Sequence, residues 1–140
     1  MLNINVGSRA IWERTITDED IFEFAKVSGD WNPIYVDDEY AENTIFGGRI
    51  VHDAFLIALI SNMIANQLPG PGSILCRQEF VFLKPVRPED TITISLEILS
   101  VAPCKHGNNI RLLIDICNQN SIEILSGETM VLYTKEIKGE

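Results

Sequence analysis

Four long stretches in the second half of the chain are strand candidates, and in one of them hydrophobic and polar residues alternate, which is the pattern of a half-buried β-strand. The alternation is almost strict over residues 91–98, so one face of that strand is expected to be buried and the other solvated. Turn-forming residues lie between the stretches, at 85–90, 103–108 and 118–121. We therefore predict consecutive strands with short links, which favour an antiparallel sheet, at residues 73–83, 91–101, 109–118 and 122–134.

The first half of the chain predicts a strand, a helix and a helical turn. Residues 8–16 mix apolar and polar positions as an irregular strand does. Thr17 and Asp20 have the spacing of a capping box, which starts a helix, and Gly29 is placed to end it. The apolar residues of this helix recur at helical spacing, so one face should pack inward; they are Ile21, Phe22, Phe24, Ala25 and Val27. Residues 30–33 are expected to turn the chain, and residues 37–41 predict a short solvated helical turn.

A second, longer helix is predicted at residues 53–67. It carries apolar residues on nearly every side, which indicates a buried helix. Prolines and glycines at 68–72 end it. A long buried helix followed only by strands predicts an α+β fold in which an antiparallel sheet wraps around the helix. Such a sheet leaves an edge exposed, and pairing of that edge or of a face would bury more surface.

Composition limits the range of functions. The chain has 140 residues, 46% of them hydrophobic, which is enough for the core of one domain spanning residues 1–140. Its net charge of −9 argues against nucleic acid and anionic membrane surfaces as partners. No signal-peptide pattern is visible, and the longest apolar run, 54–65, is too short to cross a bilayer. Three scattered cysteines favour reduced thiols in a cytoplasmic protein, and with two histidines no metal-site spacing is visible.

Residues 28–53 concentrate the side chains that could carry out chemistry. The stretch contains acids, aromatic residues, an Asn-Pro turn, a glycine pair and a histidine. It begins Ser28-Gly29-Asp30-Trp31-Asn32-Pro33-Ile34-Tyr35 and ends Gly47-Gly48-Arg49-Ile50-Val51-His52-Asp53. Because it lies directly before the long apolar helix, we expect any active site to be here.

These motifs resemble the MaoC-like hot-dog family, whose best-known members are the (R)-specific enoyl-CoA hydratases. The resemblance also includes Leu-Pro-Gly-Pro-Gly-Ser at 68–73 and Phe-x-x-Pro-Val at 82–86, and it extends over residues 11–133. It implies a hot-dog fold, with the sheet around a central helix, and a homodimer whose acyl-thioester tunnels lie near the subunit interface. It also implies addition of water to a trans-2-enoyl thioester, or its removal. The substrate would be carried on coenzyme A or an acyl carrier protein, and no further cofactor is expected.

The resemblance assigns roles to several residues. Asp30 matches the family's catalytic aspartate, and Tyr35 stands where the family has its partner histidine. The backbone amide of Asp53, at the start of the long helix, matches a donor to the thioester oxygen. Ser61, about two turns along that helix, matches a serine that supports the site.

Two of these positions depart from the family pattern. A tyrosine has an ordinary pKa near 10 against about 6.5 for histidine, so Tyr35 can donate a hydrogen bond but is a poor base at neutral pH. The family's glycine after Val-His is Asp53 here, whose carboxylate adds negative charge where an enolate would develop. Asp53 is therefore either an active-site carboxylate or a helix cap.

Each candidate also has a structural alternative. Asp30 could cap local amides, and Tyr35 could be a packing aromatic with a solvated tip. Trp31 is expected to line the acyl tunnel or to cover the core, and Asn32 beside it is a substrate-binding candidate.

The same holds for the candidates outside that turn. Ser61 could bond to a carbonyl one turn earlier. His52 binds substrate or is a hydrogen-bonded structural histidine. Lys84, with Arg87, contacts the phosphates of coenzyme A or a phosphopantetheine arm, or is a solvated turn residue.

Three functions remain open at this point. The first is a hydratase or dehydratase with an altered catalytic set. The second is a thioesterase, or an enzyme that isomerises or adds another nucleophile to an acyl thioester, in which Asp53 takes a direct part. The third is a non-catalytic partner subunit that binds acyl thioesters, which the missing histidine would explain.

Overall fold

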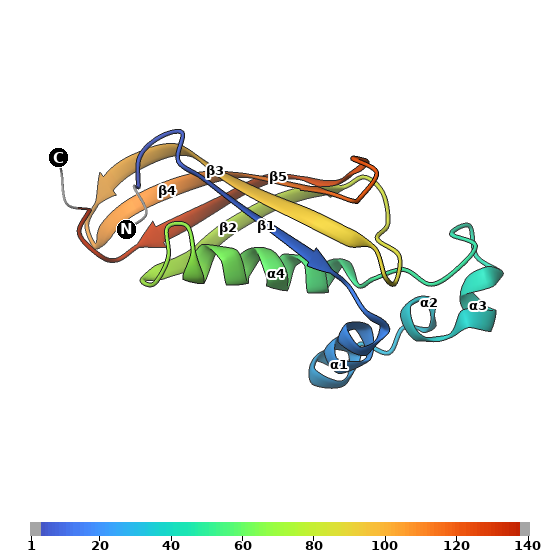
Figure 1. Cartoon of the computed structure of the whole chain (residues 1–140). Coiled ribbons are helices and arrows are strands. Elements are labelled where there is room, and N and C mark those ends of the chain that lie inside the picture. Colours follow the sequence, from blue (N-terminus) through green and yellow to red (C-terminus); the bar gives the residue numbers. More distant parts are fainter. Residues whose placement is uncertain (1–3, 138–140) are drawn as a thin grey trace.

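A computed structural model describes residues 4–137, and it shows a five-stranded sheet curved around one long helix (Figure 1). The elements are β1 (Arg9–Thr15), α1 (Asp18–Ser28), α2 (Pro33–Val36), α3 (Asp38–Glu42), α4 (Asp53–Asn66), β2 (Ser73–Phe82), β3 (Thr91–Cys104), β4 (Gly107–Cys117) and β5 (Glu123–Tyr133). The predicted arrangement, an antiparallel sheet wrapped around a long helix, is confirmed. The helix α2 was not predicted, because the chain was expected only to turn there.

The sheet has the order β1-β3-β4-β5-β2, and all of its strand pairs are antiparallel. Strands β3, β4 and β5 form the predicted run of neighbours. Strand β2 does not join β3, although it precedes it in the chain; it pairs with β5 at the far edge. The turn predicted at 103–108 has fewer residues than expected, because β3 continues to Cys104 and pairs there with Gly107.

The core lies between the concave face of the sheet and one side of α4. Alternate residues of β3 and β4 are fully buried, as the alternating pattern of residues 91–98 predicted for β3. They pack with the buried side of α4, which consists of Leu56, Leu59, Ile60, Met63 and Ile64. The helix is not buried on all sides, however. A single sheet covers only one side of it, so Ala54, Ala58, Asn62 and Ala65 are exposed on the opposite side.

The first helix follows its predicted signals but not its predicted packing. Thr17 and Asp20 form both hydrogen bonds of the capping box, and Gly29 ends α1 with a positive φ of 80°. Only Ile21 and Ala25 are buried in it, whereas Val27 is 82% exposed. The reason is its location: Figure 1 shows α1 below the start of α4, on the side away from the sheet, with α2 and α3 beyond the end of the sheet. We call residues 18–49 the helical segment.

Two expectations from composition can be compared with this structure. Among residues 4–137, no helix is long and apolar enough to cross a membrane. The three cysteines, Cys76, Cys104 and Cys117, are all free thiols in the structure.

Gly127 tests the unexpected place of β2 in the sheet. A Cβ atom at this position of β5 would overlap the carbonyl oxygen of Glu79 and the backbone of Phe80, both on β2. Gly127→Ala should therefore lower the free energy of unfolding by about 1–3 kcal/mol, as overpacking does elsewhere. The measurement is urea denaturation, with Ser126→Ala as the control in the neighbouring position. Equal stability of the two variants would contradict the close approach of β2 to β5.

Candidate active site

The predicted site residues come together where the helical segment meets α4. The ring of His52, the last residue before α4, is fully buried between two aromatic rings. It stacks on Tyr35 from α2 at a centroid distance of 4.0 Å and meets the edge of Phe24 from α1 at 4.9 Å. Its Nε2 lies 3.0 Å from the main-chain carbonyl oxygen of Asp30. One histidine thus joins Asp30 and Tyr35 to the beginning of the long helix.

The hydrogen bond to Asp30 determines the tautomer of His52. A carbonyl oxygen only accepts, so Nε2 must carry the proton and donate it. In the neutral ring, Nδ1 then holds a lone pair, and it has no partner among the described residues. The ring has no exposed surface, so the structure shows the hydrogen-bonded histidine of the structural alternative, while the substrate contact of His52 stays a prediction.

Asp30 lies in an exposed turn rather than in a closed pocket. Its Oδ1 accepts the backbone N–H of Asn32 at 3.2 Å, while its own N–H donates to the hydroxyl of Ser28. This is the local capping expected of a turn acid. One carboxylate can accept several hydrogen bonds, so this contact leaves capacity to bind and activate a water molecule.

Tyr35 is held in its neutral, proton-carrying form. Burial raises the pKa of its phenol above 10.0, and the nearby carboxylates of Asp53 and Asp30 raise it further. The phenol is therefore a hydrogen-bond donor across the neutral range, as its residue type predicted, and not a base.

Asp53 is the first residue of α4, and both its carboxyl group and its backbone N–H could contact a substrate. Burial raises the pKa of its carboxyl above 3.8, because the charged form is poorly solvated there. Its backbone N–H and that of Ala54 have no acceptor among residues 4–137, as is usual in a first helical turn. The carbonyl of His52 accepts from Phe55 at 3.0 Å instead. Two free amides at the positive end of a 14-residue helix are suited to hold an oxygen that gains negative charge.

The remaining candidates are less firmly connected to this cluster. Trp31 is 52% exposed and is not part of the core, so the alternative that it covers the core is wrong. The side-chain oxygen of Asn32 accepts the N–H of Ile34 and caps α2. Ser61 lies two turns along α4, and no hydrogen bond of its hydroxyl is found within residues 4–137. Lys84 is exposed in the link after β2.

Two arginines, Arg49 and Arg87, make structural contacts that the sequence did not predict. The guanidinium of Arg87 donates to the backbone carbonyls of Phe46, Gly48 and Arg49, so it is neither a solvated turn residue nor free to bind a phosphate. Arg49 is an ion-pair centre between helices. Only the scarcity of basic residues, 11 in a chain of net charge −9, could have drawn attention to them.

No cluster of three or more histidine, cysteine or acidic side chains within residues 4–137 is arranged to hold a metal ion. The chemistry that this arrangement offers is acid–base chemistry beside a pair of backbone donors. A carboxylate, a neutral phenol, a carboxyl of raised pKa and two free amides surround the start of α4. Such a set fits proton transfer next to a carbonyl group.

Comparison with known proteins agrees with this description. Residues 5–113 match the family described as MaoC-like domain. The chain is 35% identical to the (R)-specific enoyl-CoA hydratase of Rhodospirillum rubrum, over 93% of this chain and 88% of that protein. It is 31% identical to the 3-hydroxybutyryl-CoA dehydratase of Methylorubrum extorquens, over 96% of this chain and 83% of that protein.

A solved structure gives the same result. The unliganded R-hydratase PhaJ1 of Pseudomonas aeruginosa superimposes with a TM-score of 0.85 at 36% identity, covering 96% of this chain and 88% of that one. The fold is therefore the hot-dog fold. The chain belongs to the MaoC-like family, whose matched members include enoyl-CoA hydratases and hydroxyacyl dehydratases.

The raised pKa of Asp53 predicts how stability depends on pH. The folded protein holds this proton at pH values where the unfolded chain has already lost it, so stability falls as pH rises through that window. Asp53→Asn removes the ionisable carboxyl group, and with it this fall in stability with rising pH. The variant should gain stability relative to wild type as pH rises above the ordinary aspartate range, and the difference should shrink in acid.

Urea denaturation of both proteins from acid to neutral pH measures this difference. Glu39→Gln, an exposed acid-to-amide change in α3, is the control and should show no such trend. If Asp53→Asn is instead the less stable protein at neutral pH, the carboxylate acts chiefly as a favourable charge at the start of α4.

Proposed function

We propose that the protein is a hydratase or dehydratase that interconverts a 2-enoyl thioester and a 3-hydroxyacyl thioester. The observation that carries this proposal is the meeting of Asp30, Tyr35 and the free amides of α4 around the buried ring of His52. Membership of the MaoC-like family and the names of the matched relatives support the same reaction. Asp53 and Tyr35 make its catalytic set different from the family pattern.

In the proposed hydration, Asp30 accepts a proton from water as the water oxygen bonds to Cβ of the enoyl group. Electrons move from the double bond to the thioester oxygen, where the backbone amides of Asp53 and Ala54 hold the resulting enolate. A proton is then delivered to Cα. Dehydration is the reverse sequence, so the same groups serve both directions.

The proton for Cα has two candidate sources in the proposed site. The carboxyl of Asp53 has a raised pKa and so keeps its proton to higher pH than an ordinary aspartate. The phenol of Tyr35 is protonated at neutral pH and can donate or relay a proton. We assign the donor role to Asp53 with Tyr35 as its hydrogen-bonding partner, because a carboxyl regains its proton readily after each turnover.

Asp30→Asn tests the function most directly. The wild-type protein should remove the ultraviolet band of the enoyl thioester in crotonyl-CoA or in a longer trans-2-enoyl-CoA, because hydration destroys the conjugated double bond. Asp30→Asn should lower kcat by about 10²–10⁴-fold, the range expected when a general base is lost. Glu39→Gln removes one negative charge from the same helical segment and should leave the rate unchanged.

The same assay separates the rival functions. Release of free thiol from a saturated acyl-CoA would identify a thioesterase, since a hydratase requires the double bond. Tight acyl-CoA binding without turnover would identify a non-catalytic binding subunit. In that case Tyr35→His would show whether the family's histidine alone restores hydration.

We also propose a homodimer formed through strand β2. This strand is one edge of the sheet, and its outward backbone groups have no partner strand within residues 4–137. It carries exposed apolar side chains in and directly after the strand: Ile74, Leu75, Val81, Phe82 and Leu83. An exposed apolar edge strand favours pairing with another chain, and a two-fold axis would let β2 pair with its own copy.

A charged residue on this edge should separate the subunits. Val81→Lys places a charge on a side chain that is 59% exposed, so the single chain should fold while the pairing is weakened. Light scattering during size-exclusion chromatography should show a dimer for wild type and a monomer for the variant. Ile11→Lys, on the opposite edge strand β1, is the matched control. Dissociation by Ile11→Lys alone would place the interface at β1 instead.

The remaining assignments concern carrier, cofactor and location. We propose coenzyme A as the carrier, because the matched relatives of Methylorubrum extorquens and Rhodospirillum rubrum are named for CoA substrates. Lys84, exposed beside β2, is the proposed contact for phosphate groups. An acyl carrier protein remains the alternative. No cofactor beyond the thioester carrier is expected, and the three free thiols support a cytoplasmic location.

A further inference from the structure

Arg49 makes contacts that the proposed mechanism does not use. Its side chain is only 9% exposed, although it lies in the link between α3 and α4. One nitrogen donates to Asp18 at 2.7 Å and another to Asp38 at 2.7 Å. A third donates to the main-chain carbonyl of Tyr35 at 3.2 Å. These partners lie on α1, α3 and α2 respectively, so one guanidinium joins all three helices of the helical segment.

The geometry of these contacts is specific to arginine. Both acids occupy the first position of their helices, where a carboxylate also meets the positive end of the helix dipole. The guanidinium is planar and presents several donors in a fixed fork, so it can serve two carboxylates and a carbonyl together. The central carbon of the guanidinium lies over the ring of Phe22, 5.8 Å from the ring centroid. A nearly buried charge requires partners of this kind, because its burial is otherwise costly.

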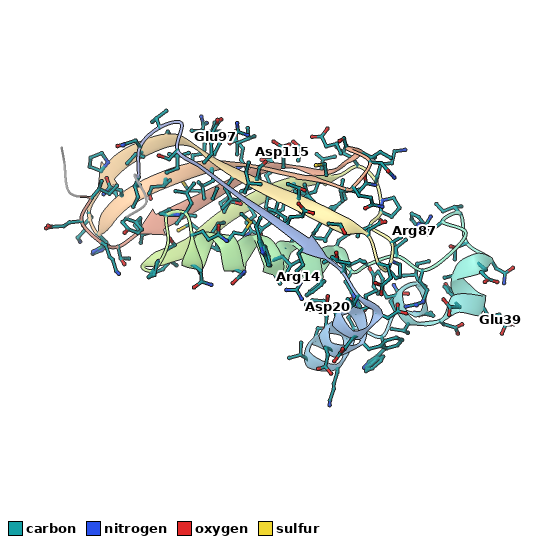
Figure 2. The ribbon with its side chains drawn as sticks, in the orientation of Figure 1. Arg14, Asp20, Glu39, Arg87, Glu97 and Asp115 are labelled. Carbon is teal, nitrogen blue, oxygen red and sulfur yellow. The ribbon has the colours of Figure 1, made fainter. Side chains whose placement is uncertain are left out.

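Arg87 connects this arrangement to the sheet. It lies in the link between β2 and β3, and its guanidinium donates to the carbonyl of Gly48 at 2.9 Å and to that of Phe46. Its own backbone N–H donates to Asp90 at 2.8 Å. Figure 2 shows Arg87 on the side of the link that faces α2 and α3. The backbone that carries Arg49 is therefore held against the sheet by a second arginine.

Other contacts attach parts of the helical segment to the rest of the molecule: the N–H of Asp18 donates to Glu89 at 3.3 Å, and the rings of Phe24 and Tyr35 pack on His52. Arg14 of β1 pairs with Asp20 of α1 at 2.9 Å, and Figure 2 shows the two side chains facing each other. His52 bonds to the carbonyl of Asp30. Arg49 joins the segment's three helices to one another, whereas each of these other contacts involves one helix or turn of the segment. Its loss should therefore let the helices shift without detaching them.

We propose that Arg49 is a positioning residue, which holds α1 and α2 so that Asp30 and Tyr35 stand at the correct distance from the start of α4. This inference rests on the proposed hydratase function, because it assigns Asp30 and Tyr35 to the reacting atoms. Small displacements of catalytic groups are costly: a misplacement of about 1 Å lowers rates by about 100-fold. Asp18 and Asp38 then help to position the catalytic groups, because they pair with the guanidinium of Arg49.

Steady-state kinetics and hydrogen exchange test the proposal together. Arg49→Gln removes the charge and the fork, and it should lower kcat for enoyl-CoA hydration by about 10- to 100-fold with little change in KM. Arg49→Lys keeps the charge without the fork and should recover part of that loss. Amide exchange should accelerate in residues 18–49 and stay unchanged in β3, β4 and β5. Arg111→Gln is the control, because it removes a guanidinium that pairs with Glu128 on the sheet.

Several outcomes would overturn the proposal. They are an unchanged kcat in Arg49→Gln, an equal loss in Arg111→Gln, or exchange that accelerates equally in the strands. Should Arg49→Gln fail to fold, Asp38→Asn removes an exposed partner instead, and an unchanged kcat in that variant counts against the proposal. A wild-type protein without hydratase activity refutes the proposed function. The exchange comparison then still decides whether Arg49 holds the helices.

Discussion

The helix α4 is apolar on almost every side, and a single sheet cannot cover all of it. The sheet buries the side that carries Leu56, Ile60 and Ile64, and this contact forms most of the core. Burial of such surface contributes about 25 cal/mol per Å², so the contact outweighs any single polar interaction in the molecule. The opposite side shows a stripe of small residues, among them Ala54 and Ala58. This side of α4 therefore contributes little apolar surface to the core.

Because α4 is held by the core, its first turn is the natural reference point for a site. The Asp53 amide belongs to this rigid element, and its orientation follows from that of the helix. Asp30 and Tyr35 do not belong to it, because Tyr35 lies on the four-residue helix α2 and Asp30 lies in the turn before that helix. Their alignment depends on polar contacts to the start of α4, of which the hydrogen bond from His52 to Asp30 is the most direct. The site therefore combines a rigid half with a half held by individual hydrogen bonds and ion pairs.

This division explains what the sequence predicts well and what it does not. The strands and α4 follow from periodicity, since residues 91–98 alternate and 53–67 do not. The pairing of β2 with β5 is invisible to such patterns, because it depends on which edge of the sheet remains free after β3, β4 and β5 have paired. The same holds for the incomplete burial of α4, which depends on the curvature and width of the sheet.

The site shows the same limit at the level of side chains. Motifs bring Asp30, Tyr35 and Asp53 to attention because their spacing is local in the chain. The ion pair of Arg49 with Asp18 spans 31 positions, and the contact of Arg87 with Phe46 spans 41. No local pattern encodes such contacts. The first becomes visible only when α1 lies beside the link before α4, and the second only when the link after β2 lies next to the helical segment.

Tyr35 and Asp53, the two residues that differ from the pattern implied by the resemblance, are best explained together. Tyr35 stands where the resemblance implies a histidine, which is a group that can exchange protons at neutral pH. Asp53 supplies a second carboxyl group at the start of α4, and burial raises its pKa, so it keeps its proton to higher pH than an ordinary aspartate. Asp30 has the opposite environment, an exposed turn with a backbone N–H donating to its carboxylate. Two carboxyl groups in unlike surroundings are how a site separates an acid from a base. In the proposed mechanism, the pair Asp30 and Asp53 thus performs the division of labour that an aspartate and a histidine perform in the family pattern.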